Sequence, residues 1–148
     1  MFWRNIRMLA IFALSVSAES FPFGGTVFVF NETAELMKII EGKKQPVDCP
    51  PGTSPVVWSF LEPAALSLQL KFTRSQREIN VKVEISDYAL TYAIEGKRVA
   101  LSARVPRMDH KPTEVYQFGN IFVYVDAFVA GLRELRHQIR FYVREKPR

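Results

Sequence analysis

The chain has 148 residues, of which 48% are hydrophobic and 24% are charged, and its formal net charge at pH 7 is +5. This is enough apolar material for one domain with a single packed core. The basic residues are scattered along the chain and no recognised nucleic-acid-binding module is present, so we expect no nucleic-acid partner.

Residues 1–18 have the layout of a secretory signal peptide. Two arginines precede the apolar run 8–16, and small residues then precede Glu19. The apolar run is too short to span the roughly 30 Å of a bilayer's hydrocarbon core. We therefore expect cleavage before Glu19, which leaves residues 19–148 as a single secreted, extracellular domain.

Asn31, Glu32 and Thr33 form the only Asn-x-Ser/Thr sequon of the chain. In an exported protein such a sequon can receive a glycan if it lies on a surface loop. Asn31 is therefore the predicted glycosylation site, and this prediction requires its amide to reach solvent.

Two segments have helical spacing. In residues 33–42, Thr33 is a capping residue, helix-favouring residues follow, and Gly42 can end a helix, so a helix is predicted there. Residues 128–142 also place apolar side chains every three or four positions, but their C-terminal part alternates as a strand would. We interpret 137–144 as a strand and the arginine-rich piece before it as a loop.

Cys49 is the only cysteine, so the chain cannot form an intrachain disulfide. Small secreted domains commonly depend on disulfides, and this one must rely on burial of apolar surface or on a partner. Two interpretations of Cys49 are open. The burial tendency of cysteine favours a buried, inert thiol, and the alternative is a disulfide-linked dimer through Cys49.

Most of the mature chain follows the period-two alternation of half-buried β-strands. In residues 66–72, for example, apolar side chains alternate with serine, glutamine and lysine. Alternate side chains of a strand point to opposite faces, so such a segment buries one face and exposes the other. Strands are predicted at 26–30, 56–61, 66–72, 79–85, 89–94, 99–105, 121–128 and 137–144. This spacing favours a sandwich or a barrel, and we expect an all-β antiparallel β-sandwich.

The run 115–132 is apolar enough to raise the question of a membrane span, but it contains Asp126. A carboxylate at the middle of a bilayer costs about 2.5–3.5 kcal/mol on insertion scales. A hairpin that turns at Gly119 and Asn120 has no such cost. We therefore predict a hairpin and no membrane span.

Three segments resemble parts of an immunoglobulin-like domain of variable type. The approach to Cys49 resembles strand B, the segment around Trp58 resembles strand C, and residues 119–125 resemble strand F. The resemblance covers residues 25–145 in outline, although the second cysteine is missing and Val123 stands near its place. It implies that Cys49, Trp58 and Val123 form the core between the two sheets.

No segment carries a recognisable catalytic or metal-binding motif. His110, His137 and Cys49 are too widely separated in the sequence to have the spacing of a metal site. The chain also lacks a Gly-x-Ser-x-Gly nucleophile motif and a phosphate-binding glycine loop. We therefore expect no enzymatic activity, no cofactor and no metal.

Binding is the function that these observations leave. The loop residues Arg107, Asp109, His110 and Lys111 have the most varied charge of the predicted loops and are the candidate binding residues. We expect a recognition module that binds an extracellular protein or a cell-surface receptor, in adhesion, defence or reproduction. The alternative is a secreted β-barrel carrier, whose abundant Phe and Tyr side chains would line a cavity for a lipid or small apolar ligand.

Overall fold

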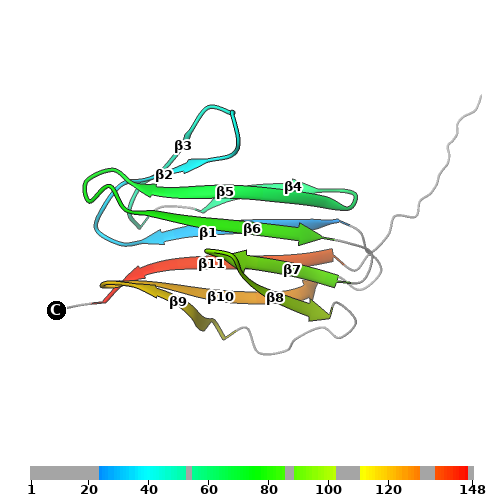
Figure 1. Cartoon of the computed structure of the whole chain (residues 1–148). Helices are drawn as coiled ribbons and strands as arrows, with labels where there is room; N and C mark the ends of the chain where they lie inside the picture. The colour runs from blue at the N-terminus through cyan, green and yellow to red at the C-terminus, as the bar shows by residue number, and fades with distance from the viewer. Residues whose placement is uncertain (1–23, 53–54, 86–88, 103–110, 131–135, 147–148) are drawn as a thin grey trace, which may run out of the picture.

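The computed structural model describes residues 24–52, 55–85, 89–102, 111–130 and 136–146 (Figure 1). These ranges contain eleven strands in two sheets and no helix. The five-stranded sheet has the order β4-β1-β11-β10-β9 and consists of β1 (Gly25–Glu32), β4 (Val56–Phe60), β9 (Thr113–Phe118), β10 (Ile121–Ala130) and β11 (Arg136–Glu145). The six-stranded sheet has the order β3-β2-β5-β6-β7-β8 and consists of β2 (Met37–Ile40), β3 (Val47–Cys49), β5 (Ala64–Phe72), β6 (Glu78–Ile85), β7 (Ala89–Ile94) and β8 (Lys97–Ser102).

Paired strands run antiparallel except β1 and β11, which are parallel neighbours. The prediction of an all-β protein with mostly antiparallel strands is thus confirmed. The strands predicted from alternation are present with shifts of a few residues at their ends. The exception is the end of the segment 99–105, because residues 103–105 lie outside the described residues.

Side chains from both sheets form one apolar core. Buried and more exposed positions alternate along β1, β5 and β6, as the period-two pattern predicts. The ring of Tyr92 on β7 meets the ring of Phe141 on β11 edge-on, with their centroids 6.0 Å apart. The two sheets therefore pack face to face as a sandwich (Figure 1).

Gly25, at the start of β1, marks a close approach between the sheets. A Cβ atom at this position would lie 2.6 Å from Ile85 Cδ1 on the six-stranded sheet and 3.0 Å from the carbonyl oxygen of His137. Since the second contact is with backbone, a side chain at residue 25 would push the strands apart. Glycine is therefore required here by space rather than by backbone conformation.

The predicted helix at 33–42 is wrong, because this segment contains strand β2. β2 pairs with β3 on one side and with β5 on the other. Met37 and Ile39 are buried in the core, whereas Lys38 and Ile40 are only half-buried on the opposite face. Helix propensities of ordinary residues differ by less than about 1 kcal/mol, so pairing on two sides and burial of two side chains outweigh them.

The predicted hairpin in the run 115–132 is confirmed where the structure describes it. β9 and β10 pair antiparallel and are joined through Gly119 and Asn120, with Gly119 at a φ of 62°. Glycine adopts this left-handed conformation without the steric penalty of a side chain. Within the described ranges, no helix is long and apolar enough to cross a membrane.

Trp58 lies at the rim of the core and not at its centre. It is half-buried on β4, one of the two edge strands of the five-stranded sheet, and its indole Nε1 donates a hydrogen bond to Glu41 Oε1 at 3.1 Å. β1 and β11 separate β4 from β10, the strand that carries Val123. Val123 and Cys49 are buried in the core, with exposed fractions of 0% and 1%.

Candidate functional site

The outward-facing side of the five-stranded sheet is unusually rich in aromatic and arginine side chains. It is formed by alternate residues of β1, β10 and β11, whose neighbours in the sequence point into the core. We call this surface the aromatic–arginine face, and it consists of Phe28, Phe30, Phe122, Tyr124, Phe128, Arg140, Tyr142 and Arg144.

The rings of this face stack on one another across strands. Phe30 and Tyr142 lie on the parallel neighbours β1 and β11, with ring centroids 4.7 Å apart and an interplanar angle of 10°. Phe28 continues the row, with its centroid 6.2 Å from that of Phe30 and an interplanar angle of 21°. The centroid separation of Phe30 and Tyr142 is close to the spacing of about 4.8 Å between neighbouring strands. Their planes therefore stand upright on the sheet, and ring edges rather than ring faces point outward.

Cationic groups cover the ring faces that remain. The guanidinium of Arg140 lies 5.5 Å from the ring centroid of Phe28 and 5.1 Å from that of Phe128. The guanidinium of Arg144 lies 4.7 Å from the ring centroid of Tyr124 and 5.3 Å from that of Tyr142. Each guanidinium plane gains cation–π attraction from the rings. The Nε of Arg140 is buried without a hydrogen-bond partner among the described residues, and the Nε of Arg144 donates to Glu32.

One acidic side chain pairs with an arginine of this face, and a second lies buried opposite the other arginine. Arg144 Nε donates to Glu32 Oε1 at 2.6 Å, and both side chains are about half-exposed. Asp126 lies directly opposite Arg140 in the register of β10 and β11 and is 0% exposed. Among the described residues, neither carboxylate oxygen of Asp126 accepts a hydrogen bond. The face therefore combines apolar ring edges with an ion pair between Arg144 and Glu32.

The outer face of the six-stranded sheet differs, because most of the residues that its strands turn outward are polar. A groove of about 440 Å³ crosses this face over β2, β5, β6 and β7. Its lining combines Ser67, Gln69, Asn80 and Lys82 with the apolar Ile40, and apolar atoms form most of its exposed surface. This face is what the alternation of apolar and polar residues in the sequence predicts for the solvent side of a sheet.

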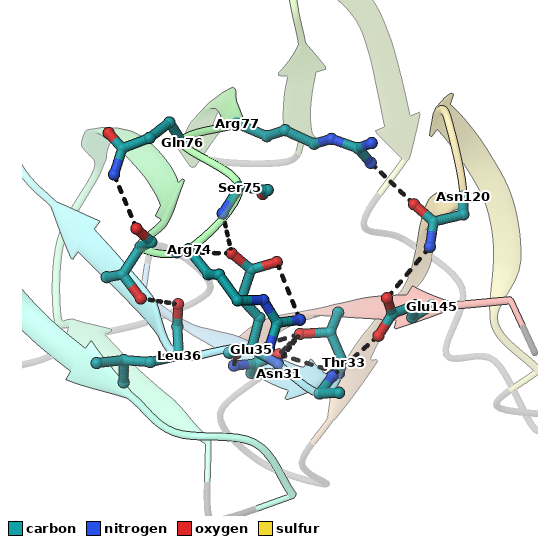
Figure 2. Close-up of polar contacts among 12 residues, drawn as sticks. Asn31, Thr33, Glu35, Leu36, Arg74, Ser75, Gln76, Arg77, Asn120 and Glu145 are labelled. Atoms are coloured by element: carbon teal, nitrogen blue, oxygen red, sulfur yellow. Dashed lines mark hydrogen bonds and ion pairs between the residues drawn. The ribbon is translucent and has the colours of Figure 1, made fainter.

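A buried polar cluster connects the two sheets at one end of the sandwich (Figure 2). Asn31 at the end of β1 is 2% exposed, and its Nδ2 donates to the carbonyl oxygens of Glu35 at 2.8 Å and Cys49 at 2.7 Å. Its Oδ1 accepts hydrogen bonds from the backbone N–H and the hydroxyl of Thr33, at 3.0 Å and 2.7 Å. A glycan on Nδ2 would replace one of the two donated hydrogens and has no space in this buried position. The fold therefore assigns the Asn31 amide a structural role that competes with the predicted glycosylation.

Glu35 extends this cluster to the turn between β5 and β6. Its Oε1 accepts hydrogen bonds from the backbone N–H groups of Arg74, at 2.8 Å, and Ser75, at 2.5 Å (Figure 2). Burial by itself raises the pKa of the Glu35 carboxyl, but the hydrogen bonds from Ser75 and Arg74, together with the Arg74 charge, outweigh it. The pKa of Glu35 consequently lies below its ordinary value.

Acid should therefore weaken the fold through Glu35. A carboxyl whose pKa is lowered by folding contributes stability above its unfolded pKa of about 4.3, and this contribution is lost as pH falls through the lower folded pKa. Glu35→Gln should reduce the free energy of unfolding at neutral pH by about 1–3 kcal/mol. Its stability should also fall less than that of the wild type between about pH 6 and pH 3. Urea unfolding across this pH range measures both effects, with Glu62→Gln, at an exposed position, as the matched control. If the free energy of unfolding depends on pH in the same way for Glu35→Gln and the wild type, Glu35 is not responsible for the loss of stability in acid.

Further side-chain contacts at the same end join three turns and strand ends. Glu145 at the end of β11 accepts hydrogen bonds from Ala34 N at 3.0 Å and from Asn120 Nδ2 at 3.1 Å. Asn120 Oδ1 in turn accepts a hydrogen bond from Arg77 Nη1 at 2.9 Å (Figure 2). The side chains of Arg77, Asn120 and Glu145 therefore all have hydrogen-bond partners within the protein, and these contacts hold the turns and strand ends together at this end of the sandwich.

Cys49 lies on β3 next to this cluster and is a free, buried thiol. Its sulfur is 3.9 Å from the carbonyl oxygen of Val29, to which the thiol can donate a weak hydrogen bond. Burial raises the pKa of the Cys49 thiol, which keeps it protonated and unreactive. Disulfide linkage to another molecule through Cys49 would require the edge of the sheet to open.

We accordingly expect Cys49 to resist alkylation in the native protein and to react promptly once urea unfolds the chain. Intact-mass measurement after timed exposure to iodoacetamide gives both rates. The protein should also migrate as a monomer on denaturing gels run without reductant. Equal alkylation rates in the native and unfolded states, or a reductant-sensitive dimer abolished by Cys49→Ser, would show that the thiol reaches the surface.

The loop residues predicted to bind a partner are not placed by the structure, except for one. Arg107, Asp109 and His110 lie outside the described residues, and Lys111 is exposed. His137 is buried on β11, with an exposed fraction of 2%. In the described part of the chain, no three His, Cys, Asp or Glu side chains gather closely enough to hold a metal ion.

The aromatic–arginine face was not predicted from the sequence. Its signal is present in β1 and in the first half of β10, where apolar residues occupy both phases of the alternation. Strands of this kind are typical of sheets that are covered on both sides. If only the alternate residues that point into the core are considered, the aromatic residues between them, which point outward, are overlooked.

Comparisons with known proteins identify no family. No protein-family model matches this chain, and no curated protein matches it at a significant level.

Proposed function

We propose that this protein is a secreted, extracellular recognition module that contacts protein partners through its aromatic–arginine face. The observation that carries the proposal is the contrast between the two outer faces of one sandwich: one has stacked aromatic rings and arginines, and the strands of the other turn mainly polar residues outward. Most rings of this face are half-buried and keep part of their surface in solvent. Aromatic residues and arginine are the types enriched where proteins meet. The signal-like layout of residues 1–18 supports the extracellular location.

The orientation of the rings favours a protein surface over a sugar as the occupant. A sugar ring stacks on the open face of an aromatic ring. Here Phe28, Phe30 and Tyr142 cover one another, and the arginine guanidiniums lie over further ring faces. Ring edges and guanidinium N–H groups instead suit the mixed apolar and hydrogen-bonding surface of a protein.

The packing of the interior favours a recognition module over a carrier. A carrier needs an apolar chamber between its sheets, whereas Phe141 and Tyr92 meet across the centre of this sandwich. The proposal does not depend on membership of the immunoglobulin family. In that family strand C lies in the sheet of strands F and G next to F, but β1 and β11 intervene here between β4 and β10.

Site-specific photocrosslinking tests the proposal. p-Benzoylphenylalanine at Tyr124, on the aromatic–arginine face, should crosslink the chain to protein on intact cells of its own organism. The same group at Ile40, on the opposite face, should not. Excess wild-type protein should abolish the adduct, and excess Tyr142→Ser should compete poorly. Adducts of equal yield from both positions, or equal competition by Tyr142→Ser, would rule out this face as the binding surface.

A further inference from the structure

We propose that the partner of the aromatic–arginine face is a second copy of this chain, so that recognition is homophilic. The inference rests on the proposed function, because it names the occupant of the same face. It is drawn from the mixed charge, the area and the shape of that face.

The face carries charges of both signs. Among the described side chains that reach its surface or its edge, Arg140, Arg144 and Lys146 are cationic, and Glu32, Glu114 and Glu145 are anionic. A two-fold axis brings a surface against a copy of itself, so a face of a single sign would repel its partner. A face built for a strongly charged, different partner would carry the opposite, uniform sign. The net positive charge of the whole chain is therefore no obstacle to pairing at this surface.

The area of the sheet matches what a stable dimer needs. Five strands about 4.8 Å apart, the two longest with ten residues each, span roughly 24 Å by 33 Å. This corresponds to roughly 600–800 Å² once the shorter edge strands are allowed for, against about 800 Å² per partner in a standard interface.

The shape of the face also permits close packing of two copies. The upright row of Phe28, Phe30 and Tyr142 forms a ridge of ring edges. A pocket of about 300 Å³, lined by Phe122, Tyr124, Arg144 and Lys146 together with Glu114 and Glu145, lies toward the other side of the same face. Ridge and pocket are on one surface, so a two-fold axis can place each against the other, which is the arrangement of an isologous interface.

Sedimentation velocity of the full mature chain from about 1 μM to about 300 μM tests the proposal over the range of micromolar affinities. We expect a reversible monomer–dimer equilibrium. Tyr142→Ser and Arg144→Gln should each weaken association at least about tenfold. The matched control, Ile40→Ser, removes a half-buried apolar side chain from the opposite face and should leave association unchanged. Thermal unfolding of each variant establishes that the fold is retained.

Each outcome supports or overturns the inference. A monomer at every concentration overturns it, as does a dimer that Ile40→Ser weakens as much as Tyr142→Ser does.

Because the face carries charges of both signs, association should also change only a few-fold when salt is raised, whereas a steep decline would indicate an interface with charges of one sign. The proposed function fails separately. If the chain is monomeric but Tyr142→Ser still loses competition in the crosslinking experiment, the face binds a different protein and only the homophilic inference is wrong.

Discussion

Asn31→Ala should lower the free energy of unfolding by about 3 kcal/mol or more, measured by urea unfolding of protein made in bacteria. The asparagine amide makes hydrogen bonds to two backbone carbonyls and accepts two from Thr33, all inside the protein. Each buried polar group that loses its partner costs about 1–3 kcal/mol. Bacterial protein carries no N-linked glycan, so a loss of stability there is due to the hydrogen bonds alone.

Thr33→Ser is the matched control for this prediction. It keeps the sequon and the hydroxyl that donates to Asn31 Oδ1 at 2.7 Å, and it should stay within about 1 kcal/mol of the wild type. Protein secreted from eukaryotic cells should show the same gel mobility before and after enzymatic removal of N-linked glycans. Wild-type stability in bacterial Asn31→Ala, or a mobility shift abolished by Thr33→Ala, would restore Asn31 as a glycan acceptor.

Phe141→Ala should be the most damaging truncation of the core, with an expected loss of about 3–5 kcal/mol. Phe141 is 0% exposed on β11, the central strand of the five-stranded sheet, and its ring meets Tyr92 of the other sheet. Total stabilities of natural domains are about 5–15 kcal/mol, so this variant should be secreted poorly and melt at a much lower temperature.

Two matched variants show whether the position or the residue type is responsible. Phe118→Ala removes the same ring from β9, where it is 43% exposed, and should cost about 1 kcal/mol or less. Phe141→Leu keeps most of the buried volume and should recover much of the loss. If Phe118→Ala and Phe141→Ala are equally destabilising, the contact between the sheets is not the energetic centre of the fold.

Local patterns in the sequence were sufficient to predict most of the strands. Strand alternation depends only on which side chains prefer water, so β5, β6 and β11 could be read from single segments. The turn at Gly119 and Asn120 could be predicted for the same reason, because a hairpin is a contact between neighbours in the chain.

Only the tertiary structure decided the features that depend on distant partners. Met37 and Ile39 form a strand because β5, about thirty residues further on, supplies backbone hydrogen bonds and apolar side chains to pack against. Together these outweigh the local helix propensity. Trp58 was expected in the core because strand order was inferred without pairing, and the parallel pairing of β1 with β11 leaves it at an edge.

The two candidate sites show the same division between sequence and structure. A sequon can be recognised from three residues, but whether Asn31 faces solvent depends on Glu35 and Cys49, which the fold brings to its amide. The rings of the aromatic–arginine face are visible in the sequence as apolar residues in the outward phase of β1 and β10. These rings form one surface because the sheet places β1 and β11, the first and last described strands, side by side, with β10 next to β11. The sequence by itself determined which residues prefer burial, and the pairing of distant strands determined which of them meet, because that pairing is a long-range interaction that no local pattern encodes.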